Sequence, residues 1–148
     1  PEQTTMNQGT SRRLDGPDRR HGFGAATHAI LRIGAGLLFM QHGAQKLLGW
    51  FGGATPEGGA VPLVSLMGLA GILELVGGLL IVIGLLTRPV AAILLLEMII
   101  AYFMAHLPMG AAPIVNRGEL ALLYALIFLF LLGNGAGPAS IDAGRKKG

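Results

Sequence analysis

The segment 63–86 constrains the fold of this chain more than any other, because it reads LVSLMGLAGILELVGGLLIVIGLL and carries a single charge, Glu74. It is 24 residues long. An α-helix rises about 1.5 Å per residue and the hydrocarbon core of a bilayer is about 30 Å thick, so about 20 apolar residues suffice to cross it. The segment therefore predicts a membrane-spanning helix.

Three further apolar segments accompany it, at residues 23–47, 89–107 and 118–135. The mean hydropathy of the chain is +0.61, and only 13% of its 148 residues are charged. The polar faces that soluble helices carry are missing from these segments, which argues against a soluble bundle. We therefore predict one all-α domain at 22–136, a four-helix transmembrane bundle.

Positively charged residues predict the orientation of the spans. The polar region 1–21, the turn at 87–89 and the C-terminal region 137–148 would share one side, and together they hold eight Lys and Arg residues. The opposite side holds two, Lys46 and Arg117. Because cytoplasmic loops are enriched in Lys and Arg, we expect both termini of this multi-pass protein to lie in the cytoplasm. The arginines of the N-terminal region lack aromatic partners, so nucleic acid is not an expected partner.

Charged residues also lie inside the predicted spans. Arg32, Glu74 and Glu97 each lie near the middle of a different span. A charge at the bilayer centre costs about 2.5–3.5 kcal/mol on insertion scales, so three unpaired charges are not expected there. We predict a buried charge network in which Arg32 pairs with Glu74, Glu97 or both.

A second polar cluster is expected at the outward ends of the first and third spans. It consists of His42, Gln45, Lys46, Tyr102 and His106. Two pairs within it are four residues apart and therefore share a helix face. These side chains donate hydrogen bonds and exchange protons, which makes them a candidate quinone site near the outer leaflet. The alternative is an interfacial belt of snorkelling lysine and anchoring aromatic side chains.

Other residues predict how the spans pack and what they do not bind. Glycines in the second span, among them Gly71 and Gly78, predict a close approach of a neighbouring helix. Thr87 is a candidate N-cap of the third span. No metal site is expected, because His42 and His106 lack a nearby histidine partner. The chain has no cysteine, which excludes disulfides, thiolate metal sites and covalent haem attachment through cysteine.

Four motifs follow one another along the chain and together cover residues 30–142. They are 39-FMQHGAQKLLGWFGG-53, 73-LELVGGLLIVIGLLTRPVA-91, 116-NRGELALLYAL-126 and 137-GPASID-142. In order and spacing they resemble the DoxX family of small bacterial membrane proteins. The resemblance implies a four-helix transmembrane bundle in the bacterial inner (cytoplasmic) membrane. Some relatives are subunits of thiosulfate:quinone oxidoreductase, and others are linked to membrane redox complexes or to resistance against quinones and catechols.

For function, the resemblance implies an accessory or quinone-associated subunit of a membrane redox complex, with no catalysis assigned to this chain. The expected cofactor is a quinone, with none bound covalently. The expected partners are the lipid bilayer and either other membrane subunits or further copies of the chain. Two alternatives stay open: a small quinone-reducing oxidoreductase subunit with an outer-leaflet quinone site, and a small transporter. The transporter is the weaker one, because paired broken helices are missing.

Overall fold

The computed structural model describes residues 17–145, and the regular elements in that range are all helices. Residues 1–16, which make up most of the predicted N-terminal region, lie outside the described part, as do residues 146–148. The described elements are α1 (Pro17–Leu48), η1 (Trp50–Gly52), α2 (Leu66–Ile72), η2 (Leu73–Gly77), α3 (Gly78–Ile83), α4 (Thr87–Ala101), η3 (Tyr102–His106), η4 (Leu107–Met109), α5 (Pro113–Asn116), α6 (Glu119–Asn134) and α7 (Ile141–Arg145).

Three helical segments are long and apolar enough to cross a membrane. They are Gly22–Leu48, Leu66–Ile83 and Thr87–Met109, with 27, 18 and 23 residues. The helix α6 is also apolar but has 16 residues, which at about 1.5 Å each reach about 24 Å, short of the bilayer core. The prediction of an all-helical, multi-pass membrane protein is therefore confirmed, while the fourth span and the side of the membrane on which the termini lie stay predictions.

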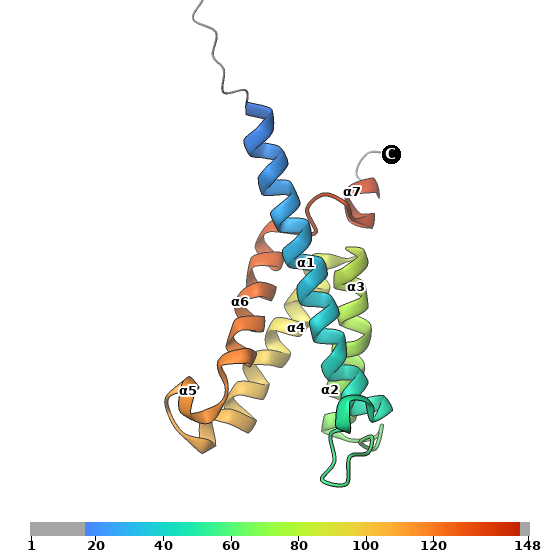
Figure 1. The fold of residues 1–148 in the computed structure, drawn as a ribbon, viewed down its shortest axis with the longest axis vertical. Helices are drawn as coiled ribbons and strands as arrows, with labels where there is room; N and C mark the ends of the chain where they lie inside the picture. The colour runs from blue at the N-terminus through green and yellow to red at the C-terminus, as the bar shows by residue number, and fades with distance from the viewer. Residues whose placement is uncertain (1–16, 146–148) are drawn as a thin grey trace, which may run out of the picture.

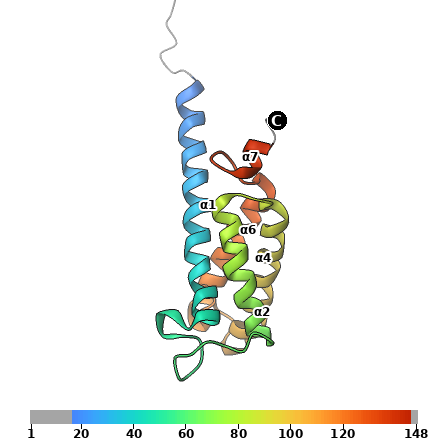
Figure 2. The same cartoon turned by 90° about the vertical axis from the view of Figure 1, so that its right-hand side faces the viewer.

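The helices pack as two pairs (Figure 1). In one pair α1 lies along α2, η2 and α3, and in the other α4 lies along α6. The pairs are close together near the turn between α3 and α4 and diverge towards the opposite end. The first turns of α1 extend past the other helices (Figure 2), and they lie at the same end of the molecule as α7.

Glycines allow α1 and the second span to approach backbone to backbone. A Cβ atom on Gly36 would lie 2.9 Å from the carbonyl oxygen of Gly78, and one on Gly43 would lie 2.7 Å from that of Gly71. Any side chain at these positions would push the helices apart. The close approach predicted from the glycines of the second span is therefore confirmed.

An aromatic core joins the two pairs. The ring of Phe39, on α1, lies 4.9 Å between centroids from the rings of both Tyr124 and Phe128, on α6. Leu94 of α4 is buried in the same core. Aromatic rings at these separations stabilise each other beyond the area they bury. The contact holds the pairs together at this depth, and beyond it they separate.

Candidate functional site

A cavity of about 680 Å³ lies between the two helix pairs, in the half of the molecule where they diverge. Its wall is largely apolar and includes Leu69 of α2 and Leu96 of α4, which are 53% and 57% exposed. The cavity is thus accessible from the surface between these two helices. Its volume is within the range of small-molecule sites, about 300–1,000 Å³. The polar side chains in its wall are His42, Lys46, Glu74, Glu97, His106, Arg117 and Tyr124.

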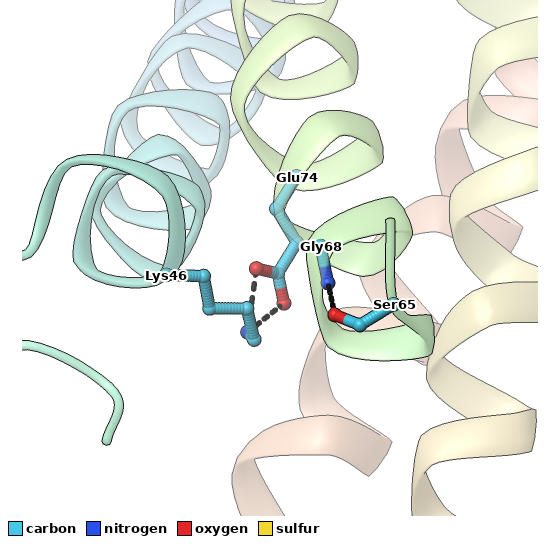
Figure 3. A network of polar contacts seen from close by, with 4 residues as sticks. All are labelled: Lys46, Ser65, Gly68 and Glu74. Atoms are coloured by element: carbon cyan, nitrogen blue, oxygen red, sulfur yellow. Dashed lines mark hydrogen bonds and ion pairs between the residues drawn. The ribbon is translucent and has the colours of Figure 1, made fainter. Parts of the chain in front are cut away.

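Lys46 and Glu74 form an ion pair in this wall (Figure 3). Lys46 lies in the last turn of α1, and its Nζ atom donates to both carboxylate oxygens of Glu74, on η2, at 2.6 Å each. The two side chains are only 14% and 6% exposed. The absence of a side chain on Gly71 lets the Lys46 stem lie against α2, since a Cβ atom there would be 3.0 Å from the Lys46 Cβ. This two-pronged geometry is what offsets the desolvation of both charges.

Two π-helical turns border the cavity. The turn η2 carries Glu74, and the turn η3 ends at His106. A π-helical turn inserts one residue into an α-helix and occurs frequently at functional sites, because it turns a side chain away from the regular helix face. Here both turns supply a polar group to an otherwise apolar wall.

Glu97 lines the same cavity from α4, and its environment differs from that of Glu74. Both Glu97 carboxylate oxygens are buried, and neither has a hydrogen-bond partner among residues 17–145. Glu74 and Lys46 line the same cavity. Leaving a buried acceptor unsatisfied costs about 1–3 kcal/mol, and more if it is charged. Glu97 is therefore an open hydrogen-bonding group at the cavity wall.

His42 and Tyr124 are neighbours in the cavity wall. The imidazole of His42 lies edge-on to the Tyr124 ring, with 5.9 Å between centroids, and also edge-on to Phe39, at 6.5 Å. Tyr124 is a cavity residue that was not predicted, because it lies within an otherwise apolar run and counts there as a core aromatic side chain. Its hydroxyl adds a hydrogen-bonding group that only the packing of α6 against α1 reveals.

The candidate quinone residues separate into two groups. His42, Lys46 and His106 line the cavity, whereas Gln45 and Tyr102 are not in its wall. Tyr102 is buried, stacks on His106 with 6.3 Å between centroids, and its hydroxyl lies 3.5 Å from the amide nitrogen of Asn116.

Asn116 joins this group to the loop before α6. The side-chain amide of Asn116 donates to the Gly110 carbonyl at 2.7 Å and accepts from the Gly118 N–H at 2.8 Å. The backbone carbonyl of Asn116 accepts from His106 Nδ1 at 3.1 Å. Every hydrogen-bonding atom of this side chain is thereby used inside the protein. Tyr102 and Asn116 consequently support His106 and the loop and lie behind the cavity surface.

The predicted ion pairing of Arg32 with Glu74 or Glu97 is wrong. The carboxylate of Glu74 is paired with Lys46, and Arg32 is buried away from the cavity, near the α3–α4 turn. The helix α1 begins at Pro17 and not near residue 23, so the middle of α1 is not the middle of the packed bundle. This shift places Arg32 at the end of the molecule where α7 lies.

Arg32 instead binds backbone carbonyls. Its guanidinium donates to the carbonyl of Ile81 at 2.7 Å, to that of Val82, and to that of Ala139 at 2.7 Å. The last carbonyls of a helix lack intrahelical partners and carry the negative end of its dipole. The arginine thus caps the C-terminal end of α3 and fastens the segment that follows α6 onto it.

Asp142 completes this contact from the C-terminal side. Its carboxylate accepts hydrogen bonds from the backbone N–H groups of Leu86 and Thr87, each at 2.9 Å, at the start of α4. Desolvation acts to raise the pKa of Asp142, but the hydrogen bonds from Thr87 and Leu86 outweigh it and leave the pKa below its ordinary value. Thr87, predicted as the N-cap, is the first residue of α4, and the capping carboxylate comes from Asp142.

Within residues 17–145, no three His, Asp or Glu side chains gather in a way that could hold a metal ion. The polar groups of the cavity are instead one ion pair, one open carboxyl group, two imidazoles, the guanidinium of Arg117 and the hydroxyl of Tyr124. These groups can donate and accept hydrogen bonds.

Comparisons with known proteins give one family match and one close relative. The family model described as DoxX matches residues 27–107. A protein of Haemophilus influenzae, described as "Uncharacterized protein", is 43% identical over 117 residues, which are 77% of this chain and 87% of the relative. No solved structure matches the chain. The family match contains the cavity residues of the first three spans, from Phe39 to His106, and ends before Tyr124.

Proposed function

Because the chain belongs to the DoxX family of membrane proteins, we propose that it is an accessory membrane subunit that binds a quinone in its cavity. In this proposal the chain is a four-helix bundle of the bacterial inner membrane with both termini in the cytoplasm. Its partners are the other subunits of a membrane redox complex, and those subunits supply the electron donor.

The observation that carries the proposal is the composition of the cavity wall. A quinone needs an apolar space for its tail and hydrogen-bonding groups for two carbonyl oxygens. The cavity offers apolar side chains over most of its surface, with Lys46, Glu97 and His42 among them. Its opening between α2 and α4 would face the hydrocarbon region, from which a lipid-soluble ligand partitions.

The cavity lining extends far enough along the helix for such a ligand. On α4 and η3 it runs from Ile93 to His106, which at about 1.5 Å per residue is about 20 Å. That length accommodates a ring together with the first part of an isoprenoid tail. A transmembrane helix of a partner, with a diameter of about 10 Å, would need more space than about 680 Å³ over the same length.

Binding of ubiquinone-1 to the purified protein in nanodiscs tests the proposal. His42→Ala should weaken binding about 5-fold, the effect of losing one hydrogen bond of about 1 kcal/mol. Gln45→Ala is the matched control, since Gln45 lies on the same helix end but outside the cavity wall, and it should leave the affinity unchanged. Quinone extracted from the protein purified in mild detergent should be stoichiometric. Absence of saturable binding to the unmodified protein would refute the proposed function.

A further inference from the structure

Glu97 differs from Glu74 and Asp142, whose carboxylates accept hydrogen bonds within the protein. Glu74 receives two hydrogen bonds from Lys46, and Asp142 receives two from backbone N–H groups. Both oxygens of Glu97 are buried without a partner among residues 17–145. The group also lies in the middle of the span Thr87–Met109, where an ionised side chain is disfavoured.

The protein itself does not resolve this conflict. A lysine is nearby, but Lys46 is already paired with Glu74 through both carboxylate oxygens. Making Glu97 the neutral acid removes the charge but adds an O–H donor, which still lacks an acceptor in the protein. The Glu97 carboxyl group is therefore open to a molecule that occupies the cavity.

We propose that Glu97 is a ligand-binding residue of this cavity and that, as a neutral carboxylic acid, it donates its O–H to a carbonyl oxygen of the bound molecule. The inference rests on the proposed function and identifies the ligand class as a lipid-soluble molecule with a carbonyl acceptor, such as a quinone. The ion pair of Lys46 and Glu74 keeps the lysine from neutralising Glu97. The cavity thus holds a hydrogen-bond donor that carries no charge.

The donor role makes binding depend on pH. Raising the pH far enough to ionise Glu97 removes the O–H, so affinity for a carbonyl ligand should fall in alkaline solution. Other groups that titrate or carry charge also face the cavity, and their contributions have to be separated from that of Glu97. They are His42 and Lys46 from α1, Glu74 from η2, His106 from η3, Tyr124 from α6, and Arg117 before α6.

Two substitutions distinguish hydrogen-bond donation by Glu97 from its ionisation. Glu97→Gln keeps a hydrogen-bond donor of the same length but cannot ionise, whereas Glu97→Leu removes donor and acceptor alike. In ubiquinone-1 titrations in nanodiscs, Glu97→Gln should bind within about 3-fold of the unmodified protein and lose the weakening at alkaline pH. Glu97→Leu should bind about 10-fold more weakly. Glu119→Leu, an exposed glutamate at the start of α6, is the matched control and should have no effect.

Thermal melting of the ligand-free protein gives a second, independent measurement. Glu97→Leu should raise the melting temperature, because it removes an unsatisfied polar group from a buried position. Equal affinity of Glu97→Leu and the unmodified protein would overturn the inference while leaving the proposed function intact. A lowered melting temperature of Glu97→Leu would overturn it too, because Glu97 would then be structural. If the unmodified protein does not bind ubiquinone-1 at all, both the proposed function and the inference fail.

Discussion

Removing one member of the Lys46–Glu74 ion pair should destabilise the protein strongly, and removing both should not. The Lys46 ammonium contacts both carboxylate oxygens at 2.6 Å, and both side chains are mostly buried. Breaking such a pair from one side costs about 3–5 kcal/mol, because a charge is left buried without its partner. Replacing both residues with apolar ones removes the desolvation penalty together with the attraction.

The two single substitutions should differ in size. Lys46→Met leaves the Glu74 carboxylate on η2 buried without its partner. The free energy of unfolding should fall by about 3 kcal/mol, at the lower end of the range for a broken buried pair, because Glu74 alone can take up a proton. Glu74→Leu should cost about 1–2 kcal/mol, since Lys46 lies in the last turn of α1 and its long stem can extend to the interface.

A double-mutant cycle in reversible detergent unfolding measures the coupling. The protein carrying both Lys46→Met and Glu74→Leu should unfold within about 1 kcal/mol of the unmodified protein, so the coupling energy should be about 3 kcal/mol or more. Gln45→Met is the control for a methionine on the same turn, and it should change stability by less than about 0.5 kcal/mol. If the free-energy changes of the two single substitutions simply add in the double mutant, the ion pair does not stabilise the fold as described.

Four further perturbations test the rest of the structure. Asp142→Ala should cost about 1 kcal/mol through the loss of a helix cap. The pKa of Asp142 in the folded protein is below the ordinary value of 3.8, so this stabilisation is complete at neutral pH and is lost as the pH falls through the folded pKa. The melting temperatures of the variant and the unmodified protein should therefore converge in strong acid. Arg32→Met should cost about 3 kcal/mol by removing three hydrogen bonds from a buried guanidinium to backbone carbonyls, with partial recovery in Arg32→Lys, and equal melts of the Met and Lys variants would contradict this. Gly43→Ala should cost at least about 2 kcal/mol, whereas Gly34→Ala, with open space around it, should be neutral or slightly stabilising. Because the chain has no cysteine, a membrane-impermeant maleimide applied to intact spheroplasts should label Glu57→Cys but not Gly144→Cys, and the reverse pattern would place the termini outside.

The sequence by itself determined the class of the protein and three helices that are long and apolar enough to cross a membrane. An apolar run of 24 residues with a single charge, such as 63–86, leaves few alternatives, because its backbone groups must be satisfied within one helix. The glycines of the second span likewise predicted a close helix contact. Any helix that packs against the glycine-bearing face can approach the backbone closely, because no side chain separates the two. His42, Lys46 and His106 were identifiable as polar groups at the ends of apolar helices, and they do line one cavity.

Only the tertiary structure decided which charges meet. The depth of Arg32 in the bundle depends on how far α1 is displaced along its axis relative to the other helices. Helix packing sets that displacement, and the apolar pattern of the sequence does not record it. Lys46 reaches Glu74 because a flexible stem can lie across Gly71, so a residue at the helix end pairs with one deeper in the bundle. Asp142 caps α4 from 55 residues away in the chain, and no local signal at Thr87 reveals it. Pairings of this kind depend on distances in space, so they emerge only when the two helix pairs are placed against each other.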